Sequence, residues 1–282
     1  MARETILVTG GTGKTGGRVA RRLVEMGHSV KVASRSGQGF VGAEPVRFDW
    51  SDTASHEQAL AFVGGVYLVA PVGALDPYPA MAAFVGRALE SGVRRFVLLS
   101  ASSLPEGGPA MGLVHRLLAQ TAPEWAVLRP TWFMQNFSEQ QHRATIRSEG
   151  SIYSATGQGR VPFVDAGDIA EVGVRALVDE DAHNTDHIIT GPEALTYGRA
   201  AAAIAEVLGR PVHHVDISEG ALTERFVAQG MELPYARLLA GMDAAIAGGS
   251  EDRTTDTVLR LTGRSPRSFA AFVRSAAEAW ER

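Results

Sequence analysis

The chain of 282 residues contains no cysteine. Thiolate nucleophiles, CxxC redox centres, iron–sulfur clusters and cysteine-ligated zinc sites are therefore excluded. A chain of this length can bury a full hydrophobic core without disulfides or a structural metal. The adjacent pair His213 and His214 would face opposite ways on a strand and has no further ligand at a suitable spacing. We therefore expect no metal site.

Lysine is almost as scarce, because Lys14 and Lys31 are the only lysines among 27 basic residues. The 31 acidic residues outnumber the basic ones, which gives a net charge of −4, and the sequence has no dense run of lysine and arginine. A protein that binds phosphodiester backbones usually carries such a basic patch. We therefore expect no nucleic-acid partner.

Long hydrophobic runs are also missing. The longest uncharged run covers residues 58–75, but glycines and a proline interrupt it. This run predicts a helix end, a turn, a buried strand and a loop rather than a membrane span. The first apolar stretch, Thr5 to Thr9, is too short for a secretory signal. We expect a cytoplasmic protein with no membrane partner, which could be a monomer or a homodimer.

Short β-branched runs alternate with longer segments of helical spacing through the first half of the chain. The expected strands are residues 6–9, 29–33, 46–48, 66–70, 95–99 and 126–128. The expected helices are residues 14–26, 55–62, 78–91, 110–121 and 131–146. The strands are almost wholly apolar, as in a parallel sheet that is covered on both faces. The pattern predicts an α/β Rossmann fold with a doubly wound parallel sheet and right-handed crossovers.

The pattern is looser after residue 147. We expect a loop over residues 147–163, and the remaining expected elements are a helix at 167–178, a strand at 187–190, a helix at 196–208, a strand at 212–215 and three further helices. We assign residues 1–150 to an NADP-binding Rossmann core. Residues 151–282 would form a smaller lobe that mostly binds substrate, with residues 151–190 partly contributing to the core.

A glycine-rich turn, Thr9-Gly-Gly-Thr-Gly-Lys-Thr-Gly16, joins the first expected strand to the first expected helix. In such a turn Gly10 permits the tight bend, Gly13 lets the backbone approach a pyrophosphate, and Gly16 lets helix and strand pack closely. The helix N-terminus then offers free N–H groups to the anion. A triphosphatase P-loop would need a glycine where Val8 stands. Dinucleotide binding is favoured over a purely structural turn.

The end of the second expected strand indicates which dinucleotide is bound. An acidic residue there would hold the ribose of NAD, whereas this chain has Arg35 and Ser36. An arginine suits a 2′-phosphate, so NADP(H) is favoured, although Arg35 could also be a solvated surface residue. Asp49 and Trp50, after the third strand, lie where a carboxylate could accept from the adenine amino group. Asp49 could equally be a turn residue.

These residues support a family resemblance. The sequence resembles the NmrA-like branch of the atypical short-chain dehydrogenase/reductases, close to its NAD(P)H-quinone reductase-like and ergot-alkaloid reductase-like members. The similar segments are residues 9–16, 128–136, 161–170 and 262–269. The resemblance implies an NADP(H)-binding fold with a variable substrate lobe, and either reductase activity or cofactor sensing without turnover.

The resemblance also implies site residues. Phosphate-cradle residues would be Gly10, Thr12, Gly13, Lys14, Thr15 and Gly16, with Arg35 on the 2′-phosphate. The remaining cofactor contacts would be Ala70, Pro71, Ser100, Ala101, Pro130 and Phe133. Phe133 would also line the substrate side of the site. An apolar, aromatic pocket for a small-molecule substrate could be lined by Tyr78, Ser102, Met111, Trp132, Met134, Tyr153 and Phe163. Each of these apolar residues could also be a core residue.

The acid/base pair of the superfamily is missing. Ordinary members use Tyr-x-x-x-Lys, in which the tyrosine protonates the alkoxide that hydride transfer creates. No tyrosine of this chain has a lysine four residues later. Some relatives carry a Glu-Lys pair after the fifth strand, where this chain has His115 and Arg116. His115 is a candidate acid, and the alternative is a buried or solvated histidine.

We therefore expect an NADPH-dependent reductase that delivers hydride to an activated electrophile such as a quinone or an iminium. Reduction of these groups gives a delocalised phenolate or a neutral amine, so it needs no strong protein acid. The main alternative is a regulator that senses NADP without turnover. An epimerase or dehydratase is less favoured, because it too needs acid/base machinery.

Overall fold

A computed structural model of the chain describes residues 5–281, which form two compact units. The first unit holds the described residues up to Pro130 together with Ala166–Ile189 and Arg260–Gly263. The second unit holds Thr131–Asp165, Thr190–Leu259 and the described residues from Arg264 onward. The boundary expected at residue 150 falls inside the second unit, since the chain leaves the first unit after Pro130 and returns with Ala166. Residues 1–4, which precede the short apolar stretch Thr5 to Thr9, lie outside the described residues.

The first unit is built on a seven-stranded sheet with the order β3-β2-β1-β4-β5-β6-β9. Its strands are β1 (Thr5–Val8), β2 (Val30–Ser34), β3 (Glu44–Arg47), β4 (Val63–Val69), β5 (Arg95–Leu99), β6 (Glu124–Pro130) and β9 (Thr185–Ile189). Every neighbouring pair is parallel. The strand order reverses between β1 and β4, which is the switch point where doubly wound sheets bind ligands. The predicted Rossmann fold is confirmed.

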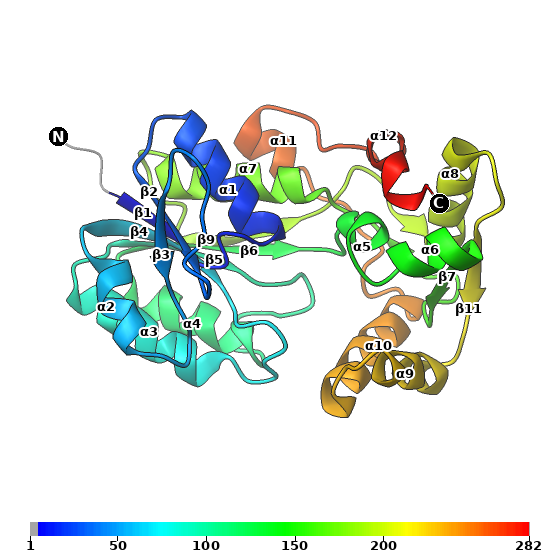
Figure 1. The fold of residues 1–282 in the computed structure, drawn as a ribbon, viewed down its shortest axis with the longest axis horizontal. Coiled ribbons are helices and arrows are strands. Elements are labelled where there is room, and N and C mark those ends of the chain that lie inside the picture. Colours follow the sequence, from blue (N-terminus) through cyan, green and yellow to red (C-terminus); the bar gives the residue numbers. More distant parts are fainter. Residues whose placement is uncertain (1–4, 282) are drawn as a thin grey trace. The chain divides into compact units, whose positions relative to one another are not determined.

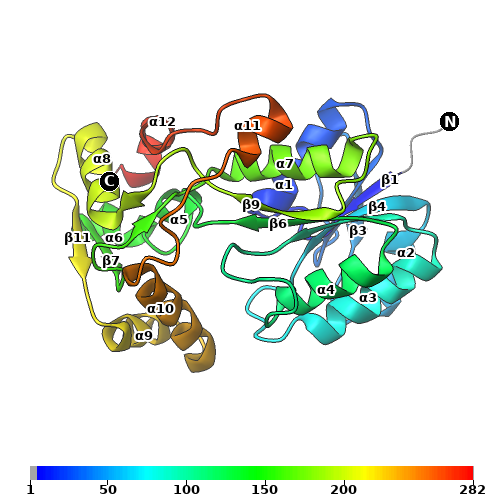
Figure 2. The same cartoon turned by 180° about the vertical axis from the view of Figure 1, so that it is seen from behind.

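Helices cover both faces of this sheet, as Figures 1 and 2 show. One face carries α1 (Lys14–Glu25) and α7 (Ala166–Val178), which pack against each other. The other face carries α2 (Ala54–Leu60), α3 (Tyr78–Glu90) and α4 (Met111–Thr121). Coverage of both faces explains why the central strands are apolar at nearly every position. α11 (Thr257–Thr262) runs across the sequence boundary between the units.

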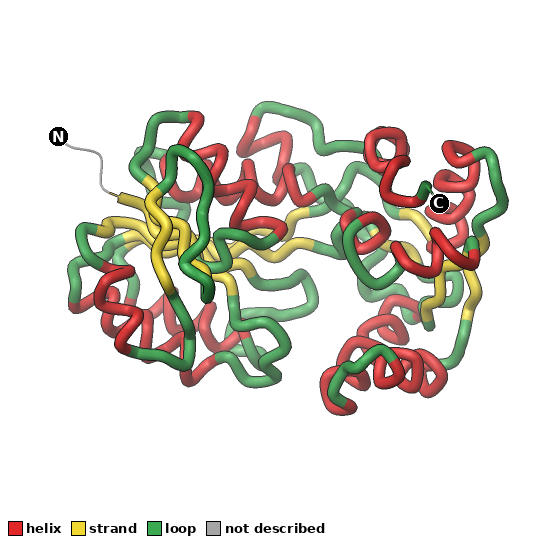
Figure 3. Tube along the Cα trace, in the orientation of Figure 1, coloured by secondary structure: helices red, strands yellow, loops and turns green. Residues whose placement is uncertain are grey.

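The second unit consists mainly of helices with short strand pairs (Figure 3). Its strands are β7 (Ser151–Ser154), β8 (Arg160–Val161), β10 (Leu195–Thr196) and β11 (His213–Asp216). β11 is parallel to β7, and β10 is antiparallel to β8. Its helices are α5 (Gln135–Ser138), α6 (Arg143–Glu149), α8 (Tyr197–Leu208), α9 (Glu219–Ala228), α10 (Leu233–Ala247), α12 (Phe269–Ala276) and a 3₁₀ turn at Ala277–Trp280.

Two expectations for this region are wrong. The helix expected over residues 131–146 is replaced by α5 and α6, because Phe133 pairs with Val164 in an isolated parallel β-bridge. Met134 N–H donates to Val164 O (2.9 Å), and Val164 N–H donates to Trp132 O (2.9 Å). The loop expected over residues 147–163 contains β7 and β8, since partners distant in sequence, β11 and β10, supply their hydrogen bonds.

The core of the second unit is aromatic. Phe163 and Tyr197 stand edge to face at 5.2 Å between ring centroids, and Phe137 contacts both rings. Trp280 is buried and donates from Nε1 to Phe137 O at 2.7 Å. α9 and α10 pack against each other and enclose a smaller apolar cluster. The described helices are all too short or too polar to cross a lipid bilayer.

Candidate functional site

The predicted cofactor residues gather at one edge of the seven-stranded sheet. Each group directly follows, or ends, a parallel strand of the first unit, and carboxyl ends of parallel strands meet at one edge. The groups are residues 10–16 after β1, 35–36 after β2, 49–50 after β3, 70–71 after β4, 100–101 after β5, and Pro130 at the end of β6. Phe133 belongs to the second unit.

The glycine-rich turn forms a cradle that fits a pyrophosphate. Gly10 has a positive φ of 59°, and Gly13 N–H donates to Gly10 O at 2.8 Å. Gly13 is the N-cap of α1, and no side chain caps this helix. A Cβ added at Gly13 would meet only Gly10 O, at 3.1 Å, so the space in front of the helix is open. The unfilled N-terminus of α1 can therefore accept an anion.

Close packing behind the cradle depends on Gly16. A Cβ at this position would lie 2.3 Å from Gly10 O, which is closer than any real contact. Thr9 fixes the turn from the other side, since its hydroxyl donates to Tyr67 O (3.0 Å) and accepts from Val69 N–H (2.8 Å). Thr9 thus ties β1 to β4 at the switch point. The sequence hint for this role of Thr9 is that it is a polar residue at the end of an apolar strand.

The expected adenosine end of the site contains Arg35 and Asp49. Arg35 and Ser36 are exposed in the turn after β2, which suits a contact with a charged group in solvent. Asp49 Oδ1 accepts from the hydroxyl (2.7 Å) and the backbone N–H (2.9 Å) of Ser51. These hydrogen bonds lower the pKa of Asp49, and the nearby charge of Arg35 acts in the same direction. Asp49 is therefore an ionised turn residue beside Arg35, and Trp50 packs edge-on against Phe48.

His56, at the start of α2, supports this end of the site and was missed by the sequence analysis. Its Nε2 lies 3.0 Å from Asp49 O, and its Nδ1 lies 3.2 Å from Arg87 Nη1. Arginine can only donate, so Nδ1 accepts and Nε2–H donates to Asp49. Burial lowers the pKa of His56, which favours this neutral form. No motif marked His56, because its partners come from the segment after β3 and from α3.

The expected nicotinamide end contains a buried hydroxyl without a partner. Ser100 is 7% exposed, and its Oγ makes no hydrogen bond with the described residues. Its backbone N–H donates to Leu128 O at 2.7 Å, which fixes it at the end of β5. A buried, unpaired hydroxyl is costly unless a ligand completes its hydrogen bonding. Ser100 is therefore suited to a polar group of a bound cofactor or substrate.

The backbone of Ser102 is held from both sides. Its N–H donates to Pro130 O (2.9 Å), and its carbonyl accepts from Arg129 Nη2 (2.8 Å). Arg129 is held in turn by Asp186 at 2.6 Å. The segment after β5 is thus rigidly attached to β6, which keeps Ser100 and Ala101 in place.

His115, the candidate acid, lies within the first unit rather than on its surface. It is 2% exposed, its ring packs against Trp125 at 5.6 Å, and its Nδ1 has no hydrogen-bond partner among the described residues. Burial lowers the pKa of His115. These features fit a neutral packing residue, and its role as an acid stays a prediction.

The two lysines have other positions. Lys14 begins α1 in the cradle. Lys31 is buried on β2, where its Nζ donates to Ala61 O (2.8 Å) and Gln58 O (3.1 Å) at the end of α2. Burial raises the pKa of Tyr67 and of Tyr197, whereas the superfamily's catalytic tyrosine needs a lowered one. The raised pKa values of Tyr67 and Tyr197 are opposite to what the superfamily's acid needs.

The predicted substrate residues are divided between the two units. Tyr78, Ser102 and Met111 belong to the first unit, and Trp132, Met134, Tyr153 and Phe163 to the second. Met134 and Phe163 are fully buried in the aromatic core of the second unit. Tyr78, Met111 and Trp132 are half-buried and keep surface for a ligand.

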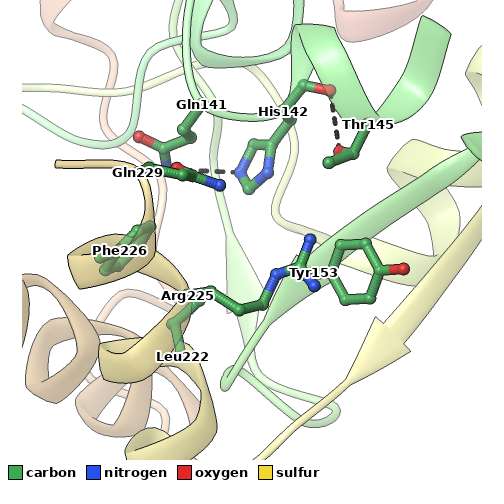
Figure 4. A pocket seen from close by; sticks show the side chains of 8 residues that line it. All are labelled: Gln141, His142, Thr145, Tyr153, Leu222, Arg225, Phe226 and Gln229. Atoms are coloured by element: carbon green, nitrogen blue, oxygen red, sulfur yellow. Dashed lines mark hydrogen bonds between the residues drawn. The ribbon is translucent and has the colours of Figure 1, made fainter. Parts of the chain in front are cut away.

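Tyr153 lines a small pocket in the second unit (Figure 4). Its ring is covered by the Arg225 guanidinium at 3.6 Å, and its hydroxyl donates to Glu149 Oε2 at 2.7 Å. The pocket holds about 10 Å³, roughly the space of one water. His142 lies at its wall beside Gln141, and burial lowers the pKa of His142 to about 3. This pocket is too small for an organic substrate.

Comparison with known proteins agrees with the geometry. Residues 10–180 match the NAD(P)H-binding family. The chain is 46% identical to the uncharacterized oxidoreductase YesF of Bacillus subtilis, over 99% of this chain and 98% of YesF. It is 41% identical to agroclavine dehydrogenase of Claviceps fusiformis, over 98% of each chain.

Solved structures share the fold. The triphenylmethane reductase of Citrobacter sp., solved with NADP(H), superposes with a TM-score of 0.81 at 24% identity, covering 96% of this chain and 99% of that one. The described strand order is that of a Rossmann fold. The chain therefore belongs to the NAD(P)H-binding family, and it is an NAD(P)H-dependent oxidoreductase.

Proposed function

We propose that the protein transfers hydride from NADPH to an activated small-molecule electrophile, a quinone or an iminium, without a tyrosine–lysine acid. The observation that carries this proposal is the position of the two lysines: Lys14 begins α1 in the cradle, and Lys31 is buried on β2 and donates to carbonyls at the end of α2. Neither stands four residues after a tyrosine, as the lysine of the superfamily's acid does. NADPH, when bound, supplies the hydride.

The products of such a reaction explain why no strong acid is needed. Hydride addition to an iminium carbon gives a neutral amine and requires no proton. Hydride addition to a quinone gives a delocalised phenolate, which solvent water can protonate. The protein then acts by holding the electrophile and excluding alternative orientations.

Residues of the first unit would divide the work of holding the cofactor. Gly10, Gly13 and the first turn of α1 would bind the pyrophosphate. Arg35 would bind the 2′-phosphate and so select NADPH over NADH. The unpaired Ser100 hydroxyl would complete its hydrogen bonding at the nicotinamide end.

The relatives support an oxidoreductase on a compact organic substrate. One relative is named for the dehydrogenation of agroclavine, and it covers nearly the whole chain at 41% identity. That likeness extends over both units. The substrate of the present chain is not fixed by that relative's name.

The experiment is anaerobic mixing of the protein and NADPH with a panel of quinones, cyclic iminiums and unactivated ketones, followed at the nicotinamide absorbance. We expect oxidation of NADPH by a quinone or an iminium and not by the ketones. Reduction of ketones as fast as that of quinones or iminiums would show that an acid exists and would contradict the proposal.

His115 is tested in the same assay. His115→Ala would lower kcat, with NADPH affinity unchanged, if the imidazole were the proton donor. We expect instead that any loss appears equally in NADPH binding and in turnover, because the ring packs against Trp125.

A further inference from the structure

The small pocket of the second unit lies between α9 and the segments around α6 and β7 (Figure 4). Helix α9 contributes Arg225 and Gln229 to its lining. The other side contributes Gln141, His142 and Tyr153. The volume of about 10 Å³ admits one water or one monatomic ion and no larger group. All of the described lining residues belong to the second unit, which therefore builds the pocket alone.

Arg225 brings a positive charge to this pocket, and no aspartate or glutamate is among the described lining residues. The guanidinium stacks on the Tyr153 ring at 3.6 Å from its centroid. The ring face attracts the cation but carries no net charge. Glu149 accepts from the Tyr153 hydroxyl at 2.7 Å and forms no ion pair with Arg225. The charge of Arg225 is thus unbalanced within the described part of the second unit.

The other half-buried arginines of the described second unit show how such a group is usually satisfied. Arg267 Nη1 lies 3.2 Å from Asp165 Oδ2. Arg210 Nη2 donates to the backbone carbonyls of Ile146 (3.0 Å) and Trp280 (3.2 Å). Arg225 is equally half-buried, but no described residue accepts a hydrogen bond from it. Its guanidinium therefore has donors to offer to a ligand.

His142 adds a neutral donor to the wall of the pocket. The residue is buried, and burial lowers its pKa to about 3, so the imidazole is uncharged at neutral pH. Gln141 Nε2 lies 3.3 Å from His142 Nε2. An amide nitrogen can only donate, so His142 Nε2 accepts and the proton is on Nδ1. That Nδ1–H makes no hydrogen bond with the described residues, and neither does the side chain of Gln229.

We propose that this pocket binds a monatomic anion, chloride or a halide of similar size. Arg225 supplies the charge, and His142 Nδ1–H and the Gln229 amide supply further hydrogen bonds. The carboxylate or phosphate of an organic molecule is too large for the space. A water molecule would fill the pocket but would leave the charge of Arg225 unbalanced. The inference is independent of the proposed hydride transfer.

A bound anion would connect two clusters of the second unit. Helices α9 and α10 enclose an apolar cluster of their own, and Asp243 of α10 is tied to the segment after β7 by accepting from Ala155 N–H at 3.2 Å. The His142 ring contacts the aromatic core at Phe137 and Tyr197. An anion held by Arg225 and His142 would thus join α9 to that core. We expect it to stabilise the folded chain, since the unfolded chain has no such site.

The direct test is the chlorine NMR linewidth of sodium chloride solutions containing the full chain. The protein is saturated with NADP⁺, so that the phosphate cradle does not bind chloride. We expect the wild type to broaden the line and added bromide to reverse the broadening. Arg225→Gln, which keeps a planar amide for the Tyr153 ring and removes the charge, should raise the chloride Kd about tenfold or more.

The matched control is Arg237→Gln, because Arg237 is an exposed arginine of α10 that does not line the pocket. Its line broadening should equal that of the wild type. Equal broadening by the wild type and Arg225→Gln would overturn the inference, and the pocket would then hold water only. A loss of the same size in Arg237→Gln would also overturn it, since the effect would then come from net charge.

Thermal unfolding gives a second readout. Tm is compared in sodium chloride and in sodium gluconate at equal ionic strength, because gluconate is too large for the pocket. We expect Tm of the wild type and of Arg237→Gln to be about 2–4 °C higher in chloride. Arg225→Gln should show no difference between the salts. A wild-type Tm that is the same in both salts would contradict the inference.

A further variant keeps the test decisive if Arg225→Gln does not fold. Gln229→Leu changes an exposed position at the end of α9 and removes one donor. It should raise the chloride Kd about fivefold, in line with the loss of about one hydrogen bond. Chloride binding that is unchanged in Gln229→Leu would remove the amide from the site and overturn the assignment of this pocket.

Discussion

His56 Nε2 lies 3.0 Å from the backbone carbonyl oxygen of Asp49, and this bond joins α2 to the segment that follows β3. On its other side His56 accepts from Arg87 of α3 at 3.2 Å, and its ring stacks on Phe48 with 4.9 Å between centroids. The imidazole is thus held by Arg87 and Phe48 while it donates to Asp49. We expect it to position the adenosine end of the cofactor site without touching the cofactor.

Replacing this imidazole should weaken cofactor binding selectively. His56→Ala removes the donor to Asp49, so KM for NADPH should rise about five- to tenfold, in line with the loss of about one hydrogen bond. kcat should be unchanged, because the group is remote from the reacting atoms. His56→Gln, whose Nε2 can reach the same carbonyl, should recover most of the affinity. Equal effects of both variants on kcat and KM would contradict a positioning role.

The cradle can be tested by adding one methyl group at a time. Gly13→Ala places a Cβ in the open space before α1, with Gly10 O at 3.1 Å as its only neighbour. The fold should tolerate it, but NADPH affinity should fall at least tenfold, since the methyl group occupies the pyrophosphate position. Titration by tryptophan fluorescence measures the affinity, and thermal unfolding measures the stability.

The neighbouring glycines supply the comparison. Gly16→Ala should lower both affinity and stability, the latter by about 1–3 kcal/mol, because its Cβ would lie 2.3 Å from Gly10 O. Gly86→Ala on α3, where a Cβ meets nothing within 4 Å, should stabilise the protein by about 0.5–1 kcal/mol and leave affinity unchanged. Wild-type affinity in Gly13→Ala would rule out a pyrophosphate at this turn.

Arg35 should determine the preference for NADPH over NADH. Arg35→Ala removes a charge-assisted contact with the 2′-phosphate, so the ratio of kcat/KM for the two cofactors should fall about 10- to 100-fold. Arg47→Ala is the control, since Arg47 is exposed and pairs with Asp52 at 2.8 Å. The ratio should not move in the control. An equal fall in kcat/KM with NADH and with NADPH would show that Arg35 does not contact the 2′-phosphate.

Stability should depend on pH through Asp243. Its pKa is raised from 3.8 to about 6 in the folded protein, so the folded state binds this proton more tightly than the unfolded state. The stabilising contribution is present below pH 3.8 and is lost as the pH rises through 6. Asp243→Asn should therefore gain stability relative to the wild type, by up to about 3 kcal/mol between pH 4 and pH 8. Urea unfolding across this range measures the difference, and a constant difference would contradict the raised pKa.

The sequence predicted the first unit well because its signals are local. β5 (Arg95–Leu99) was predicted with its observed bounds, since an apolar strand between two helices needs no distant information. The cradle could also be predicted from the sequence, because Gly10, Gly13 and Gly16 lie close together in one turn. Parallel sheets bind ligands at the carboxyl ends of their strands, so the residues expected to contact the cofactor all lie at that edge of the sheet.

The second unit was harder to predict because its structure depends on distant partners. β7 forms only because β11, some 60 residues later, pairs with it. The segment before α5 is not part of a helix because Phe133 forms a β-bridge with Val164, which is distant in sequence. His56 was missed for the same reason, since its position depends on Arg87, a partner distant in sequence.

The central claim is hydride transfer from NADPH to an activated electrophile without a protein acid. Stopped-flow measurement of NADPH oxidation in single turnover, with a cyclic iminium as acceptor, tests it most directly. We predict rapid oxidation with a rate that varies little between pH 7 and 9, because no protein group donates a proton, and slower oxidation by an unactivated ketone. Tight binding of NADPH with no oxidation by any iminium or quinone would contradict the account and favour a protein that senses the cofactor.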